Sequence, residues 1–212
     1  MSEMVPFADR LKKVCTSQTQ QVLVAVEELR LQGIDVVDLG AGEPDLPTPE
    51  HIKAAATRAI QNDFTKYTVG AGISELRTAI AKHYRDRYGV IYDTNSVVVT
   101  AGGKQALYNT AVALFGPGDE VITHVPGWPS IVEQIRLVGA EPILVRTQAE
   151  DRFEVRTQSI LEAVTPRTRG VIINSPGNPT GAVLPESELE HLADELKNLP
   201  IWVILDLCYE QL

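Results

Sequence analysis

Three polar side chains, Asn178, Asp206 and Tyr209, have the types and spacing for chemistry on a bound ligand. Asp206 ends an apolar run, and its carboxylate is costly to desolvate unless something cationic meets it. Asn178 and Tyr209 add an amide and a phenol, which are hydrogen-bonding groups. Asn178 or Asp206 alone could simply serve a turn or cap a helix. All three together favour a ligand site.

The surrounding residues predict the elements that position these side chains. Val171–Asn174 is a short apolar run of the kind found in strands buried on both faces. Prolines and glycines in 176–181 force a loop, and apolar residues at helical spacing predict a helix over 186–198. Ile201–Leu205 is a second apolar run. A strand, a helix and a strand make one crossover unit with parallel strands. Open parallel sheets bind ligands at the carboxyl ends of their strands.

The motif Asn-Ser-Pro-Gly-Asn-Pro-Thr-Gly, followed by Asp206-Leu-Cys-Tyr209, resembles the class I aminotransferases of the aspartate aminotransferase type. These are pyridoxal-phosphate enzymes of fold type I. The resemblance implies pyridoxal 5'-phosphate as the cofactor, with Asp206 paired to its protonated pyridine nitrogen. It also implies that Asn178 and Tyr209 bond the phenolic oxygen and that Asn178 touches the substrate. A carboxylate at the ring nitrogen keeps that nitrogen protonated, which deepens the electron sink.

Two further segments gain a role from the same resemblance. Gly102-Gly103-Lys104 precedes a predicted helix, and a glycine turn there suits an anion, although a plain tight turn has the same sequence. The resemblance implies that these residues bind the cofactor phosphate, mainly through backbone N–H groups. Trp128 would lie against the pyridine ring and contact the substrate, with a core tryptophan as the alternative. Gly127 departs from the family, which usually has an aromatic residue there.

The amino-terminal part of the chain carries two more resemblances. The Gly-Glu-Pro-Asp segment resembles the family's entry segment, in which the backbone at Gly42 touches the substrate. The pattern Tyr67…Gly72…Leu76-Arg77 resembles the segment whose tyrosine reaches across a dimer interface to the partner's cofactor phosphate. The resemblance therefore implies a homodimer. Without it, Tyr67 would be read as a half-buried packing residue.

Strand candidates near residues 97, 121, 142, 171 and 202 alternate with helices. This alternation predicts an α/β fold with a doubly wound, mainly parallel sheet. A further short strand is expected over Ile34–Leu39. We expect residues 1–45 to be the amino-terminal segment of a smaller domain. Residues 46–212 would then be the cofactor-binding large domain, truncated at its carboxyl end.

Composition narrows the function classes. The chain has 212 residues, is 44% hydrophobic and carries a net charge of −9, which argues against nucleic acid or an anionic membrane as a partner. No apolar run approaches the ~20 residues of a membrane helix, and the first fourteen residues lack the apolar core of a signal peptide. Cys15 and Cys208 have no metal or redox spacing, so free thiols in a reducing cytoplasm are expected.

The resemblance extends from about Val22 to Leu212, and a full enzyme of this type is about twice as long. In the family order, the Schiff-base lysine and the arginine that grips the substrate carboxylate lie beyond Leu212. None of the seven lysines here lies in a Ser-x-x-Lys segment. We therefore expect the amino-terminal half of an enzyme, with no catalytic residue of its own and no activity alone. Leu207 replaces the family's common glutamate, which weakens assignment to a narrow subfamily.

The predicted function is the transfer of an amino group between an amino acid and a 2-oxo acid. The same cofactor residues would also fit another fold-type-I enzyme, such as a carbon–sulfur β-lyase or a cyclopropane-carboxylate synthase. A non-catalytic, aminotransferase-like sensor domain is a further alternative. A nicotinamide dehydrogenase is disfavoured because its glycine fingerprint is absent. The sequence does not identify the substrate side chain.

Overall fold

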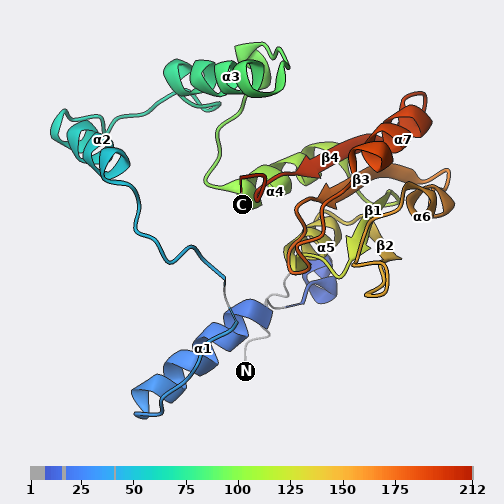
Figure 1. The fold of residues 1–212 in the computed structure, drawn as a ribbon, viewed down its shortest axis with the longest axis horizontal. Coiled ribbons are helices and arrows are strands. Elements are labelled where there is room, and N and C mark those ends of the chain that lie inside the picture. Colours follow the sequence, from blue (N-terminus) through green and yellow to red (C-terminus); the bar gives the residue numbers. More distant parts are fainter. Residues whose placement is uncertain (1–7, 16–17, 41, 212) are drawn as a thin grey trace, which may run out of the picture. The chain divides into compact units, whose positions relative to one another are not determined.

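The computed structural model describes residues 8–15, 18–40 and 42–211. The remaining residues, which include parts of the predicted small-domain segment 1–45 and of its loop at 41, lie outside the description. The chain divides into two units, whose helices and strands are labelled in Figure 1. One contains residues 101–212 with the amino-terminal stretch 1–17, and the other contains residues 18–100. A domain boundary at residue 45 stays a prediction.

The larger unit is built from a parallel four-stranded sheet, three helices that connect its strands, and two helices that precede the first strand. Its strands are β1 (Glu120–Val125), β2 (Glu141–Arg146), β3 (Thr168–Asn174) and β4 (Trp202–Asp206), in the order β2-β1-β3-β4. Its helices are η1 (Asp9–Lys13), α4 (Gly103–Leu114), α5 (Pro129–Leu137), α6 (Thr157–Glu162) and α7 (Glu186–Leu196). Each predicted strand from residue 121 onward is confirmed.

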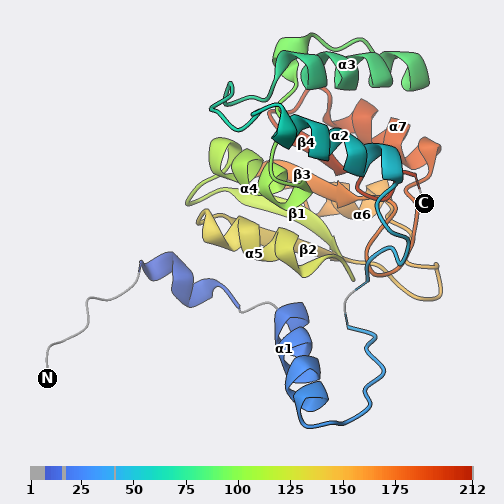
Figure 2. The same ribbon diagram turned by 90° about the vertical axis from the view of Figure 1, so that its left-hand side faces the viewer.

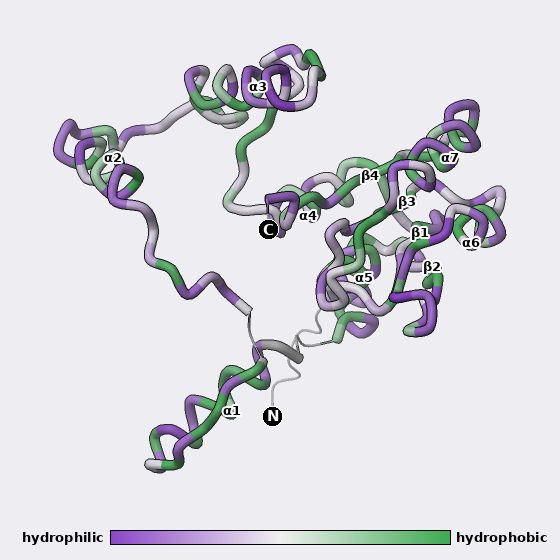
Figure 3. The backbone as a smooth tube through the Cα atoms, in the orientation of Figure 1, coloured by the Kyte–Doolittle hydropathy of each residue, from purple (hydrophilic) through white to green (hydrophobic). Residues whose placement is uncertain are grey.

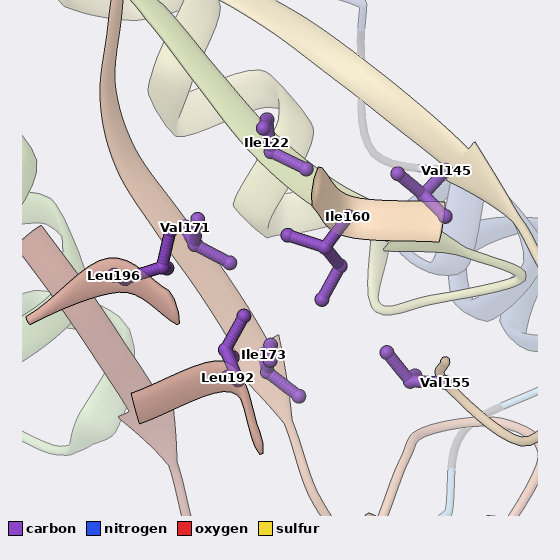
Figure 4. Packing of buried hydrophobic residues seen from close by; sticks show 8 residues of the cluster. All are labelled: Ile122, Val145, Val155, Ile160, Val171, Ile173, Leu192 and Leu196. Atoms are coloured by element: carbon purple, nitrogen blue, oxygen red, sulfur yellow. The ribbon is translucent and has the colours of Figure 1, made fainter. Parts of the chain in front are cut away.

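Helices cover both faces of this sheet, as expected for a doubly wound fold. Figure 2 shows α4 and α5 on one side of the strands. Their apolar residues pack with alternate strand residues in one buried cluster: Ala111, Phe115, Val121, Ile131, Ile135, Ala140 and Ile172. Figure 4 shows the cluster on the opposite face, where α6 and α7 pack: Ile122, Val145, Val155, Ile160, Val171, Ile173, Leu192 and Leu196. Because successive strand side chains point to opposite faces, one apolar run supplies both clusters.

Hydropathy follows this layered arrangement. In Figure 3 the apolar colour runs along β3, which lies between two strands and is buried through Val171, Ile172 and Ile173. The strand β4 is equally apolar but lies at an edge of the sheet, and its Trp202 and Val203 are exposed. Position in the sheet, and not composition, sets the burial of these two strands.

The smaller unit contains α1 (Gln18–Leu31), α2 (Glu50–Gln61), α3 (Ser74–Tyr88) and the short η2 (Thr94–Ser96). Gly72 and Arg77, from the predicted tyrosine motif, hold the segment after η2. A Cβ on Gly72 would lie 2.7 Å from the Val99 side chain, and Gly72 has φ +104°. The Arg77 Nε donates to the Val97 carbonyl oxygen at 3.0 Å. Both residues therefore have a packing role here.

Two predicted strands are absent. Neither Ile34–Leu39 nor the predicted strand over residues 96–100 pairs with a strand in the part of the chain that the structure describes. A strand is stabilised by hydrogen bonds to a neighbour, so β-branched and apolar composition alone does not create one. Val37 and Leu39 are accordingly exposed, as is Val98.

Across residues 8–15, 18–40 and 42–211, no helix combines the length and apolar character needed to span a membrane.

Candidate cofactor site

The candidate site lies at the carboxyl ends of β3 and β4, as the crossover unit predicts. These strands pair in parallel register up to Asn174 beside Asp206. A cavity of about 390 Å³, including its open mouth, is lined by the last residues of β3 and β4, by the loops after β1, β3 and β4, and by the start of α4. The lining residues are Gly103, Lys104, Trp128, Asn174, Asn178, Asp206, Cys208 and Tyr209. Six of the nine residues predicted for the site are among them.

Asp206 presents its carboxylate at the end of β4. Its Oδ1 accepts the backbone N–H of Cys208 at 3.1 Å, which fixes the turn that follows the strand. The side chain is half-buried, and no lysine or arginine of the described residues forms an ion pair with it. An acidic group in this setting suits a cationic ligand atom.

Asn178 and Tyr209 contact each other directly. The Asn178 Nδ2 donates to the Tyr209 hydroxyl oxygen at 3.1 Å. The two residues come from different loops, after β3 and after β4, so the bond joins the two strand ends. Because the phenol oxygen accepts from Asn178, its own proton stays available for an acceptor in the cavity.

The start of α4 forms another wall. Gly102 is the N-cap and has φ +80° and ψ 168°, a positive-φ backbone conformation that favours glycine. The first N–H groups of a helix have no partner within the helix and suit an anion. Gln134 Nε2 donates to the Lys104 carbonyl oxygen at 2.9 Å, which links α5 to this turn. Gly102 itself precedes the lining residues by one position.

Trp128 lies both at the core and at the cavity, whereas its contact with the cofactor ring and the substrate stays a prediction. It packs against the buried cluster beneath α4 and α5, and it also lines the cavity. The Lys104 Nζ lies 5.2 Å from the centre of its ring, a cation–π distance. The Lys104 side chain therefore lies at the cavity, in addition to the backbone contribution that the sequence predicted.

Gly127, the departure from the family pattern, lies close to the backbone of His124. A Cβ at this position would lie 2.6 Å from the His124 carbonyl oxygen and 3.9 Å from the His124 Cε1 atom. Any larger residue would therefore need the backbone to shift. The backbone observed here therefore has no room for a larger residue at position 127.

Gly42 and Tyr67 belong to the unit of residues 18–100. Gly42 is exposed with open space around it, and the Tyr67 side chain is fully exposed. Their assignment to the substrate and to the partner's cofactor stays a prediction.

Asn174 and Cys208 line the cavity but were not predicted as site residues. The Asn174 Oδ1 accepts the Asn178 N–H at 2.8 Å, and its Nδ2 donates to the Asp206 carbonyl oxygen at 3.1 Å. Asn174 is a polar residue at the end of a buried strand, and this position could have indicated a site residue. For Cys208, the spacing within Asp-x-x-Tyr gives no such signal, because the residue before the tyrosine could face either way.

The site therefore joins a carboxylate, an amide–phenol pair and a helix N-terminus at one edge of a doubly wound sheet. This is the arrangement of a ligand-binding crevice in an open α/β fold. The chain belongs to the family "Aminotransferase class I and II", whose model matches residues 34–212. The predicted family and fold class are thereby confirmed.

Curated relatives and solved structures agree with this assignment. The chain is 42% identical over 206 residues to a probable aspartate/prephenate aminotransferase of Thermus aquaticus, covering 97% of this chain and 54% of that protein. It is 44% identical over 210 residues to an aspartate/prephenate aminotransferase of Cereibacter sphaeroides, covering 99% and 52%. The structure of Thermus thermophilus aspartate aminotransferase with maleate matches at a TM-score of 0.92 and 42% identity, covering 95% and 53%. The chain spans about half the length of the curated relatives it matches.

Proposed function

We propose that the protein containing this chain is a pyridoxal-phosphate-dependent aminotransferase that exchanges an amino group between an acidic amino acid and a 2-oxo acid. The observation that carries the proposal is the Asp206 carboxylate, which lines one cavity together with the hydrogen-bonded pair of Asn178 and Tyr209. Membership of the class I and II aminotransferase family supports it.

The residues present fit this cofactor at three points. Asp206 offers a carboxylate without a cationic partner in the described part of the chain, as a protonated ring nitrogen requires. The Tyr209 hydroxyl accepts from the Asn178 amide, so its own O–H can donate a hydrogen bond to the phenolate oxygen of the cofactor. The N-terminus of α4, where Gly102 has positive φ, suits a phosphate.

When bound, pyridoxal phosphate supplies an electron-withdrawing ring that stabilises negative charge on the α-carbon of the amino acid. The residues of this chain would tune that ring. Asp206 would hold the proton on the ring nitrogen, Asn178 and Tyr209 would stabilise the oxygen anion, and Trp128 would cover the ring face and exclude water.

Lys104 favours an acidic substrate. It carries the only cationic side chain among the described residues that line the cavity. Its ammonium lies over Trp128, the ring expected beside the substrate. Relatives named for aspartate and prephenate, and a matching structure with maleate, are consistent with a second carboxylate in the substrate.

Three further statements belong to the proposal and rest on the family resemblance. The lysine that holds the cofactor covalently would follow Leu212, so residues 1–212 alone would not transaminate. The whole protein would be a homodimer in which Tyr67 reaches the partner's cofactor phosphate. It would work in the cytoplasm, where Cys15 and Cys208, both free and exposed, stay reduced.

The test is to express the protein from its complete reading frame, add pyridoxal phosphate, and measure keto-acid formation from aspartate and 2-oxoglutarate. Lys104→Met should raise the KM for aspartate about tenfold, the cost of one charge-assisted contact. Lys197→Met is the matched control, since Lys197 pairs only with the surface residue Asp194 among the described residues.

Two of the alternatives would be recognised when other amino acids are offered to the same protein. Pyruvate released from a sulfur-containing amino acid without a keto-acid acceptor would indicate a β-lyase. Tight cofactor binding without turnover of any amino acid would indicate a sensor domain. Turnover of aspartate that Lys104→Met leaves unchanged would remove Lys104 from substrate recognition.

A further inference from the structure

The strands β1 and β3 separate just below the candidate site, and a histidine side chain joins them there. Their backbone pairing runs up to Thr123 beside Ile172. Beyond that point, the Nε2 atom of His124 on β1 accepts the backbone N–H of Asn174 on β3 at 3.3 Å. His124 and Asn174 are only 6% and 3% exposed. An imidazole therefore replaces the backbone acceptor that a continued ladder would supply.

The Asn174 side chain forms hydrogen bonds to the segments on both sides of the site. Its side-chain oxygen accepts the N–H of Asn178 at 2.8 Å, and its amide nitrogen donates to the carbonyl oxygen of Asp206 at 3.1 Å. Asn178 in turn donates to Tyr209. A continuous set of hydrogen bonds thus leads from His124 to the groups that would touch the cofactor.

We propose that His124 and Asn174 are positioning residues, which fix the Asp206 carboxylate at a set distance from the Asn178–Tyr209 pair. The proposal rests on the function proposed above, because it concerns the same cofactor. Neither residue needs to touch the reacting atoms. Asn174 holds the backbone on both sides of the site, and His124 holds Asn174.

The chemistry of the imidazole agrees with this role. Only an unprotonated Nε2 can accept a hydrogen bond, so His124 acts as a neutral group. Burial lowers the pKa of His124 and thereby favours that neutral form. Gly127 is part of the same arrangement, because a Cβ there would lie 2.6 Å from the carbonyl oxygen of His124.

The test uses the protein expressed from its complete reading frame, with three variants. His124→Leu removes the acceptor and keeps a buried side chain of similar size, whereas His124→Gln keeps an acceptor. Val155→Ala is the control for simple destabilisation, since Val155 is equally buried but lies in the core cluster under α6 and α7. Hydrogen–deuterium exchange of segment 174–178 is measured without cofactor, and pyridoxal-phosphate affinity is measured by fluorescence.

His124→Leu should speed exchange in segment 174–178 and weaken cofactor binding about tenfold, the effect of one lost buried hydrogen bond. His124→Gln should keep most of the exchange protection and most of the cofactor affinity. Val155→Ala should change neither the exchange of segment 174–178 relative to other segments nor the cofactor affinity. Unchanged exchange, or faster exchange with unchanged affinity, would overturn the positioning role while leaving the proposed function intact. If the unmodified protein binds no pyridoxal phosphate, the proposed function fails, and the positioning role fails with it.

Discussion

Replacing Asp206 by asparagine would isolate the contribution of one negative charge. The two side chains have nearly the same shape. The asparagine oxygen can still accept the Cys208 N–H that Asp206 Oδ1 accepts at 3.1 Å, so the turn after β4 should be retained. The charge that would meet the ring nitrogen is lost, and among the described residues that line the cavity no other carboxylate could replace it.

The size of the effect follows from the setting of the carboxylate. Two unit charges in hydrogen-bond contact interact by about 5 kcal/mol at an effective dielectric constant of about 20. Asp206 is half-buried, so solvent screening reduces this to about 3 kcal/mol. If the interaction acts mainly on the transition state, kcat should fall about a hundredfold. Asp206→Ala should lose at least as much, because it also frees the Cys208 N–H, while keeping some cofactor.

The assay is steady-state transamination by the protein from its complete reading frame, with cofactor occupancy followed by absorbance. Asp194→Asn serves as the matched control, because Asp194 is an exposed acid whose ion pair is with Lys197. Turnover by Asp206→Asn within about threefold of the unmodified protein, at full cofactor occupancy, would remove Asp206 from the ring nitrogen.

Four other predictions follow. Gly127→Ala should lower the Tm, because its Cβ would lie 2.6 Å from the His124 carbonyl oxygen. Gly116→Ala is the control and should leave the Tm unchanged, because a Cβ there meets nothing within 4 Å. Equal Tm values for the two variants would contradict the close approach at Gly127. Burial lowers the pKa of His124 below its ordinary value of 6.5, so the unfolded state binds more protons and the free energy of unfolding should fall as the pH drops below about 6.5. Urea unfolding between about pH 8 and pH 5 measures this, and a fall of the same size in His124→Gln would assign it to other groups. The whole protein should sediment as a homodimer, with activity reduced by Tyr67→Phe; an active monomer would refute a shared site. Residues 1–212 expressed alone should form no keto acid and show weak amide protection, and a protected fragment that turns over aspartate would contradict both parts.

Sequence reasoning succeeded where a pattern is local. The apolar runs ending at Asn174 and Asp206 predicted β3 and β4, and the helical spacing between them predicted α7 and hence a parallel pair. It failed for Ile34–Leu39 and for the predicted strand over 96–100, because a strand also needs a partner, which composition does not report.

The same distinction explains why the groups expected to touch the cofactor were predicted but their supports were not. Asp206 and Tyr209 stand in a short motif, so their spacing alone brings them to one strand end. His124 and Asn174 are 50 positions apart and meet only because β1 and β3 pair up to Thr123 and then diverge. That divergence is a property of register, since a shift of one residue would turn the imidazole to the other face of the sheet. A substitution that alters the register of β1 should therefore disturb Asp206 and Asn178 without changing any residue of the motif.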